Sequence, residues 1–168
     1  LPYDVVYDDD GKPMTYGTPP LGDNPTSQDV LIAGLFTKAN LLDVIQNFTV
    51  FEPIGGKVIK KMARYQQFRA VHKTIERLKS GATRDDKGGV IWHTQGSGKS
   101  LTMVFLTIKM RRDPELRDHK LVFLTDRTQL DGQLTETFRN AQNETVHRAD
   151  SVKSLQQLLA SDAPNVVT

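Results

Sequence analysis

The stretch Gly89-Val-Ile-Trp-His-Thr-Gln-Gly-Ser-Gly-Lys-Ser100, followed by the apolar residues 101–110, decides the fold of this 168-residue chain. The apolar run at residues 90–92 predicts a β-strand that ends in a glycine-rich loop. A helix that is apolar nearly all round, and therefore buried, is predicted from Ser100 to about Met110. A strand, a glycine loop ending in Lys-Ser and a helix are the layout of a phosphate-binding loop.

The residues of this loop suit contact with a nucleotide. Gly96 and Gly98 let backbone N–H groups approach phosphate oxygens without a Cβ in the way. The helix N-terminus adds donors and partial positive charge, Lys99 would meet the β- and γ-phosphates, and Ser100 would take one Mg²⁺ position. His93 stands where the usual pattern has its first glycine. The alternative is a chance glycine-rich turn with an exposed lysine; the flanking strand and helix favour the phosphate loop.

Bulk composition describes an ordinary globular domain. The chain is long enough for one domain with a sizeable core, and its lack of cysteine excludes disulfides and cysteine-based zinc sites. No apolar run approaches the length of a membrane span, and the N-terminus lacks the features of a signal peptide. We therefore expect a cytoplasmic protein without a membrane partner. Because no initiating Met is present, we expect the chain to be cut from something larger.

Charge is distributed unevenly. Residues 1–56 carry 2 basic and 8 acidic side chains, residues 57–84 carry 9 basic and 1 acidic, and residues 85–168 carry 11 of each. The basic block at 57–84 is a candidate for facing a polyanion; a solvated helix face is the alternative.

The sequence divides into two predicted regions, residues 1–56 and residues 57–168, and the second region contains the glycine loop. Residues 1–26 predict a loop-rich lead-in, in which Asp8-Asp9-Asp10 is either a metal cluster or, more simply, solvent-facing. A helix is predicted from a capping box at Thr26 and Asp29, and a second helix from a cap at Asn40. Their predicted apolar stripes are Leu31, Ile32, Leu35 and Phe36, then Leu41, Leu42, Val44 and Ile45. A short strand follows at 48–51, and Pro53, Gly55 and Gly56 predict a linker.

Strands and helices alternate in the second region. A helix is predicted at 64–79, with Phe68, Val71, Ile75 and Leu78 on its buried face. Strands are predicted at 120–125, 145–147 and 165–168, with helices after Asp126 and from Ser151 to Ala160. This alternation indicates an α/β fold with an incomplete parallel sheet and right-handed crossovers, preceded by a mainly helical connector.

Three stretches together resemble a superfamily-2 helicase motor, and more narrowly the restriction (motor) subunit of type I restriction–modification enzymes. Arg64-Tyr65-x-Gln67 resembles the Q-motif, whose glutamine amide reads the adenine edge. A polar residue at a helix start is the alternative. Residues 92–100 are close to that family's own form of motif I, where His93 is expected.

The third stretch, residues 124–133, resembles motif Ia beside the nucleic-acid track. Thr125 and Arg127 would contact a phosphate backbone there, or Asp126 is simply a helix cap and Arg127 a surface residue. Residues 30–52 resemble the connector from an upstream nuclease domain, so the resemblance covers roughly 28–168. It assigns nucleotide contacts to a larger set: Arg64, Tyr65, Gln67, Thr94, Gln95, Gly96, Ser97, Gly98, Lys99 and Ser100.

The resemblance implies a RecA-like P-loop NTPase domain that uses ATP and Mg²⁺ to translocate duplex DNA, with cleavage by a separate nuclease domain. It also implies methyltransferase (modification) and specificity subunits as partners. Residues 121–168 hold no acidic pair after a strand, such as the pair that holds Mg²⁺ and positions water. We therefore expect this chain to bind nucleotide weakly, through Lys99 and its neighbours, without turnover.

Three other functions remain open at this point. A stand-alone superfamily-2 helicase or remodeller would lack an upstream nuclease pattern. A non-catalytic module would bind nucleic acid through the basic block beside a vestigial loop. A small-molecule kinase usually has its phosphate loop near the chain start, whereas some 90 residues precede it here.

Overall fold

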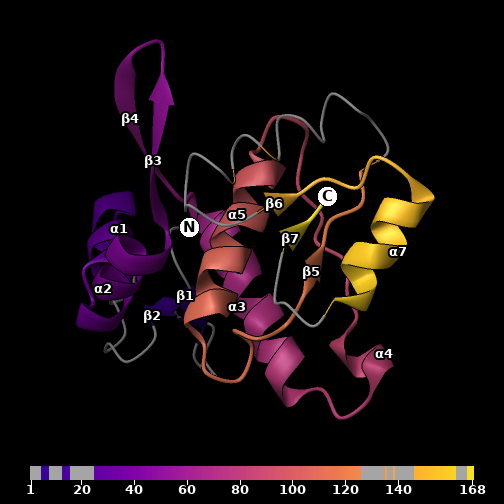
Figure 1. Ribbon diagram of the computed structural model, residues 1–168. Coiled ribbons are helices and arrows are strands. Elements are labelled where there is room, and N and C mark those ends of the chain that lie inside the picture. Colours follow the sequence, from indigo (N-terminus) through magenta and orange to yellow (C-terminus); the bar gives the residue numbers. More distant parts are fainter. Residues whose placement is uncertain are drawn as a thin grey trace. The chain divides into compact units, whose positions relative to one another are not determined.

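The computed structural model describes residues 5–7, 13–15, 25–125, 135, 138, 146–161 and 166–168 (Figure 1). The chain forms two compact units, Leu1–Thr49 with Met62–Ser97, and Val50–Lys61 with Gly98–Thr168. The predictions for residues 8–10, 126–134 and Thr145 fall outside the described residues. In the described part of the chain, no helix is long and apolar enough to cross a membrane.

Two short strands and two helices open the first unit. Strands β1 (Val5–Tyr7) and β2 (Pro13–Thr15) pair in antiparallel fashion. Helix α1 (Ser27–Leu35) begins at the predicted capping box: Asp29 N donates to Thr26 Oγ1 over 3.2 Å, and Thr26 N donates to Asp29 Oδ2 over 3.0 Å. The predicted buried stripe is wrong, because Val30 and Gly34 are the buried positions of α1. Leu31, Ile32 and Phe36 are exposed.

Helix α2 (Lys38–Asn47) begins earlier than the sequence predicts. Thr37 is its N-cap, and Thr37 Oγ1 accepts from Asn40 N over 3.3 Å. The predicted cap, Asn40, instead lies inside the helix, and its Nδ2 donates to Gly34 O over 2.7 Å. Of the predicted apolar stripe only Val44 is buried. The helix type therefore follows the sequence pattern, whereas its start and its buried face do not.

Of the three residues that predicted a linker, Gly55 and Gly56 form the turn of a β-hairpin, and Pro53 lies in its first strand. Strands β3 (Thr49–Ile54) and β4 (Lys57–Met62) form a two-stranded sheet. Gly55 and Gly56 connect them with φ values of 58° and 76°, which suit a tight hairpin turn that side chains with a Cβ would strain. Residues 57–60 are exposed, and Lys61 Nζ pairs with Glu52 Oε2.

Helix α3 (Tyr65–Ser80) confirms the helix predicted at 64–79. Phe68 and Val71 are fully buried and Ile75 nearly so, as predicted, whereas Leu78 is only half-buried. The rings of Phe48 and Phe68 lie 4.6 Å apart, so α3 packs on the segment that follows α2. His72 Nε2 lies 2.7 Å from Asp43 Oδ2, a contact that is short but not aligned as a hydrogen bond.

Residues 88–94 follow the short helix α4 (Arg84–Lys87) and are extended without being a strand. The strand predicted at 90–92 is wrong for this structure: Val90 and Trp92 are 90% and 89% exposed. An apolar run becomes a strand only when a neighbouring strand supplies its hydrogen bonds, and none of the described strands pairs with it.

The second unit holds a parallel sheet, as predicted. Its strands are β5 (Leu121–Val122), β6 (Val146–His147) and β7 (Val166–Val167), in the order β5-β7-β6 (Figure 1). Both neighbours run parallel to β7, with Val166 opposite Leu121 on one side and Val146 on the other. Val166 and Val167 are fully buried, as a central parallel strand requires.

Two helices accompany this sheet in the second unit. Helix α5 (Lys99–Arg112) is the helix predicted after the glycine loop; Val104, Phe105 and Thr107 are fully buried. Helix α7 (Val152–Ala160) confirms the helix predicted from Ser151, whose side chain is its N-cap. The predicted division of the chain at residues 56 and 57 stays a prediction.

Candidate nucleotide-binding site

The glycine loop has the backbone that a phosphate cradle requires. Gly96 and Gly98 have φ values of 75° and 81°, in the left-handed region that residues with a Cβ rarely adopt. A Cβ built on Gly96 would meet no atom within 4 Å, so the glycine is needed there for its conformation and not for space. The open surroundings of Gly96 leave its backbone accessible to a ligand.

A local turn shapes the first half of the loop. Ser97 N donates to Thr94 O over 3.3 Å, and Ser97 Oγ donates to the same carbonyl over 2.7 Å. Gln95 and Gly96 lie at the exposed tip of this turn. The Ser97 hydroxyl is therefore committed to closing the turn, and its backbone is the part left to face a ligand.

The second half of the loop opens helix α5. Gly98 is the N-cap, and its carbonyl accepts from Thr102 N over 3.1 Å. Lys99 is the first residue of the helix and is exposed, while Ser100 is half-buried. The first N–H groups of a helix have no acceptor within it and carry partial positive charge, so this end favours an anion.

Gln67 connects the start of α3 to the loop. Its side chain is only 3% exposed. Its Oε1 accepts from Arg64 N over 2.8 Å, and its Nε2 donates to Ser97 O over 3.4 Å, a long hydrogen bond. The sequence interpretation missed this bridge to the loop, although the resemblance to the Q-motif had marked both residues. The adenine-reading role of Gln67 stays a prediction.

The other predicted site residues are placed as follows. Arg64 and Tyr65 are exposed at the start of α3, so they and Gln67 lie together in the first unit with Thr94–Ser97. Thr125 is exposed, three residues beyond the end of β5. Arg127 falls outside the described residues, so its predicted DNA contact stays a prediction, as does that of Thr125.

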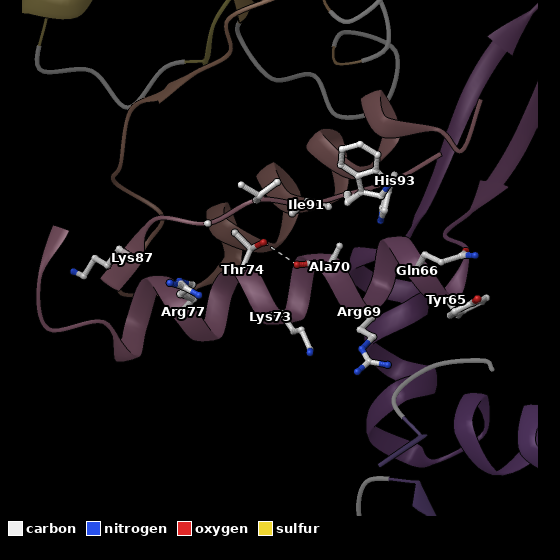
Figure 2. A pocket seen from close by; sticks show the side chains of 13 residues that line it. Tyr65, Gln66, Arg69, Ala70, Lys73, Thr74, Arg77, Lys87, Ile91 and His93 are labelled. Carbon is white, nitrogen blue, oxygen red and sulfur yellow. Dashed lines mark hydrogen bonds between the residues drawn. The ribbon is translucent and has the colours of Figure 1, made fainter. Parts of the chain in front are cut away.

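A groove of about 540 Å³ lies beside α3 (Figure 2). Its walls are one side of α3 and the extended segment that follows α4. Figure 2 shows Ala70 and Thr74 facing Ile91 across the groove, while the side chains of Arg69 and Lys73 leave α3 on the side turned away from Ile91. The full lining consists of Tyr65, Gln66, Arg69, Ala70, Lys73, Thr74, Arg77, Lys87, Gly89, Val90, Ile91, Trp92 and His93.

A capping box holds one end of this groove in place. Thr83 Oγ1 and Thr83 N both donate to Asp86 Oδ2, over 2.7 and 2.9 Å. These hydrogen bonds, aided by the charge of Arg77, lower the pKa of the Asp86 carboxyl below its usual range. Arg77 Nε also donates to Asp86 O over 2.7 Å, which ties α4 to α3.

The donors of the loop fit the phosphates of a nucleotide better than a bare metal ion. Among the described residues, no group of three or more His, Asp or Glu side chains is placed to hold a metal ion. The Ser100 hydroxyl at the start of α5 is the side chain predicted to meet Mg²⁺.

Comparison with known protein families gives a match over most of the chain. The family model for the SWI2/SNF2 ATPase matches residues 66–168. The matched part begins within α3 and contains the whole glycine loop and helix α5.

Curated relatives cover a similar part of the chain. The type I restriction enzyme HindI endonuclease subunit of Haemophilus influenzae is 39% identical over 79% of this chain and 13% of its own length. The putative type I restriction enzyme MjaIXP endonuclease subunit of Methanocaldococcus jannaschii is 39% identical over 86% of this chain and 14% of its own. The C-terminal part of the putative type I restriction enzyme MpnIIP endonuclease subunit, from Mycoplasma pneumoniae, is 30% identical over 75% of this chain and 62% of its own. This chain thus spans about one seventh of the first two relatives.

Proposed function

The chain belongs to the SWI2/SNF2 ATPase family, and on that basis we propose that it is part of the ATP-dependent motor of a type I restriction endonuclease. In this proposal ATP hydrolysis drives translocation along duplex DNA, and a separate nuclease domain cuts. The fold in this proposal is the first part of a RecA-like domain, to which the parallel sheet and the loop–helix unit would belong.

The backbone geometry of the glycine loop is the observation that best supports this proposal. Two glycines with positive φ stand immediately before the N-terminus of a 14-residue helix whose first residue is Lys99. Backbone N–H groups, the helix end and the ammonium group of Lys99 are all suited to phosphate, and none of them is suited to a cation. Names of the relatives, all type I restriction endonuclease subunits, favour the restriction motor over a stand-alone helicase.

Each residue of the loop has a distinct task in the proposal. Gly96 and Gly98 allow the backbone to wrap the phosphates, and Lys99 neutralises the β- and γ-phosphate charge. Ser100 takes one position on the Mg²⁺ that the nucleotide brings, and Mg²⁺ would neutralise charge on the transferring phosphate. Arg64, Tyr65 and Gln67 would hold the adenine from the start of α3, with Thr94, Gln95 and Ser97 completing the contacts.

The proposed partners follow from the same assignment. Duplex DNA is the proposed track, with Thr125 and Arg127 on its phosphate backbone. Modification and specificity subunits of the same restriction complex are the proposed protein partners. A small-molecule kinase is disfavoured by the family to which residues 66–168 belong.

Calorimetric titration with MgATP tests the loop directly. We expect measurable heat for the wild-type chain and at least a tenfold weaker association for Lys99→Ala, because the ammonium group contributes a charge-assisted contact of about 1.5–3 kcal/mol. Lys153→Ala, which removes an exposed lysine of α7, is the matched control and should bind as the wild type does. Equal and negligible heats for the wild type and Lys99→Ala would reject a functional phosphate loop.

A further inference from the structure

We propose that the groove beside α3 binds a single strand of nucleic acid, with phosphates along the cationic edge of α3 and a base against Trp92. Every lining residue, from Tyr65 to His93, belongs to the first unit. The groove does not include the residues of the phosphate loop, Thr94–Ser100. The proposal therefore does not depend on the phosphate loop, although Tyr65 is shared with the proposed adenine contacts.

Cations line one edge of the groove at a regular spacing. Arg69, Lys73 and Arg77 recur every four residues on α3, which places them on one face with about 6 Å of helix rise between successive residues. Lys87 adds a fourth positive charge from α4. Glu76, the one acidic residue in the α3 sequence, does not line the groove.

Three of these four charges are available to a ligand, whereas Arg77 already donates to Asp86 O and acts on the Asp86 carboxyl. Within residues 25–125, which the structure describes without a gap, no ion pair joins Arg69, Lys73 or Lys87 to a carboxylate. Arg69 and Lys73 are exposed, and their side chains leave α3 on the side turned away from Ile91 (Figure 2). From Arg69 to Arg77 the helix rises about 12 Å, so the row would meet several phosphates in succession. A chain of phosphates complements this row better than one phosphate group does.

The opposite wall supplies the surface for a base. Trp92 is 89% exposed, and Ile91 is also exposed beside it. A cationic groove next to exposed aromatic side chains is the arrangement that binds single strands, because every base has a flat face that stacks on an aromatic ring. Bases in a duplex are already stacked on one another, so Trp92 would favour an unpaired strand.

The fluorescence of Trp92 can be used to measure binding, because Trp92 is the one tryptophan of the chain. We expect a short oligothymidylate, added without ATP at low salt, to quench the Trp92 fluorescence and saturate. Binding should weaken with salt, at about 0.7 log units per log unit for each phosphate contacted. The double variant Arg69→Ala/Lys73→Ala should reduce that slope by about 1.4, since it removes two contacts.

Four variants distinguish binding in this groove from general charge effects and from binding at the phosphate loop. Lys79→Ala removes an exposed cation of the same helix that does not line the groove, and it should bind the strand as the wild type does. Lys99→Ala should retain the full quench. Trp92→Ala, followed by anisotropy of a labelled strand, should bind about tenfold more weakly, and Trp92→Phe should restore most of the affinity because stacking tolerates any aromatic ring.

Four results would overturn the proposal. They are an absence of quenching at low salt, an unchanged salt slope in the double variant, equal affinity for a duplex of the same length, and full affinity in Trp92→Ala. An ATP titration adds a fifth: quenching by ATP alone at the concentrations that suffice for the strand would reassign the groove to a mononucleotide. Circular dichroism of each variant confirms that the affinities are compared between folded chains.

Discussion

Gly81 leaves no room for a side chain where α3 ends. A Cβ there would lie 2.7 Å from Lys87 Cγ and 3.0 Å from both Arg77 O and Lys87 N. Two of these atoms belong to the backbone, so Gly81→Ala must displace α4 from α3. We expect it to lower the free energy of unfolding by about 1–3 kcal/mol in urea titration. Gly89→Ala is the control, because its nearest atoms would be 3.7 and 3.8 Å away, and it should change stability little.

The lowered pKa of Asp86 predicts that the stability of helix α4 depends on pH. Hydrogen bonds from Thr83 lower the pKa of the Asp86 carboxyl in the folded chain, so the capping box stabilises α4 above the usual carboxyl range. That contribution is lost as the pH falls through the lowered value. In Thr83→Ala the side-chain hydrogen bond is absent, so the pKa of Asp86 should rise toward its usual range in an NMR titration. Asp29, whose pKa is lowered by Thr26, should titrate unchanged; a parallel shift of both carboxyls would contradict the local cause.

The contacts of a single residue could be predicted where its partner is close in sequence. The Thr26–Asp29 capping box follows from a spacing of three residues, so the sequence predicted it. The tertiary contacts of Gln67 and Gly81 were not predicted. Gln67 donates a hydrogen bond to Ser97 O, and Gly81 lies against Lys87. The glycines of the phosphate loop were predictable because their pattern is itself local. The contact between Gln67 and Ser97 joins residues thirty apart, which local pattern does not reveal.

The C-terminal end of helix α7 is capped by Lys120, which directly precedes β5. Lys120 Nζ donates to Leu158 O over 2.6 Å and to Leu159 O over 2.9 Å, and it also contacts Ser161 O. These carbonyls carry the partial negative charge of a helix C-terminus, so the ammonium group both pairs with them and offsets that charge. Lys120 thereby fixes α7 next to the start of β5 in the second unit.

Lys120→Met tests this arrangement at the level of the helix. The substitution keeps most of the aliphatic side chain and removes the charge, and we expect it to cost about 1 kcal/mol of stability. Hydrogen exchange should accelerate first at the amides of α7. Lys153→Met, near the exposed N-terminal end of α7, is the matched control. Equal effects of the two substitutions would show that the helix C-terminus gains nothing from Lys120.

Element type was more predictable than element surroundings. The helices at α1, α3, α5 and α7 follow local periodicity and capping, which the sequence contains. The buried face of α1 was not predictable, because Leu31 and Ile32 are as apolar as Val30 and only tertiary neighbours decide among them. The segment at 90–92 fails as a predicted strand for a similar reason, since strand formation depends on a partner.

The whole chain is expected to bind ATP without consuming it. In the proposed function its phosphate loop would supply contacts for the ground state, whereas residues 121–168 contain no acidic pair after a strand to position an attacking water. Phosphate release by the purified chain should therefore equal the background of buffer and MgATP. Turnover above that background, and its loss in Lys99→Ala, would show that other residues of this chain supply the missing function.

The layout of the whole chain was predictable only in part. The parallel sheet was predicted because the continuous apolar run at 120–125 is typical of a parallel strand, and the parallel pairing of β5 with β7 confirms it. The burial expected of that run is not found in β5, where Val122 is exposed. The two compact units were not predicted, because their bounds depend on contacts between distant segments. Val50–Lys61, for example, belongs to the unit that resumes at Gly98.

The β3–β4 hairpin has a consequence for how the protein behaves at high concentration. In the described part of the chain neither strand pairs with a third, so each keeps an open edge, and Val58 on β4 is 71% exposed. Lys57 and Lys60 lie on the same exposed strand, and their positive charges repel the equivalent strand of another copy. Acetylation of these lysines would remove that repulsion and leave an apolar strand edge able to start self-association.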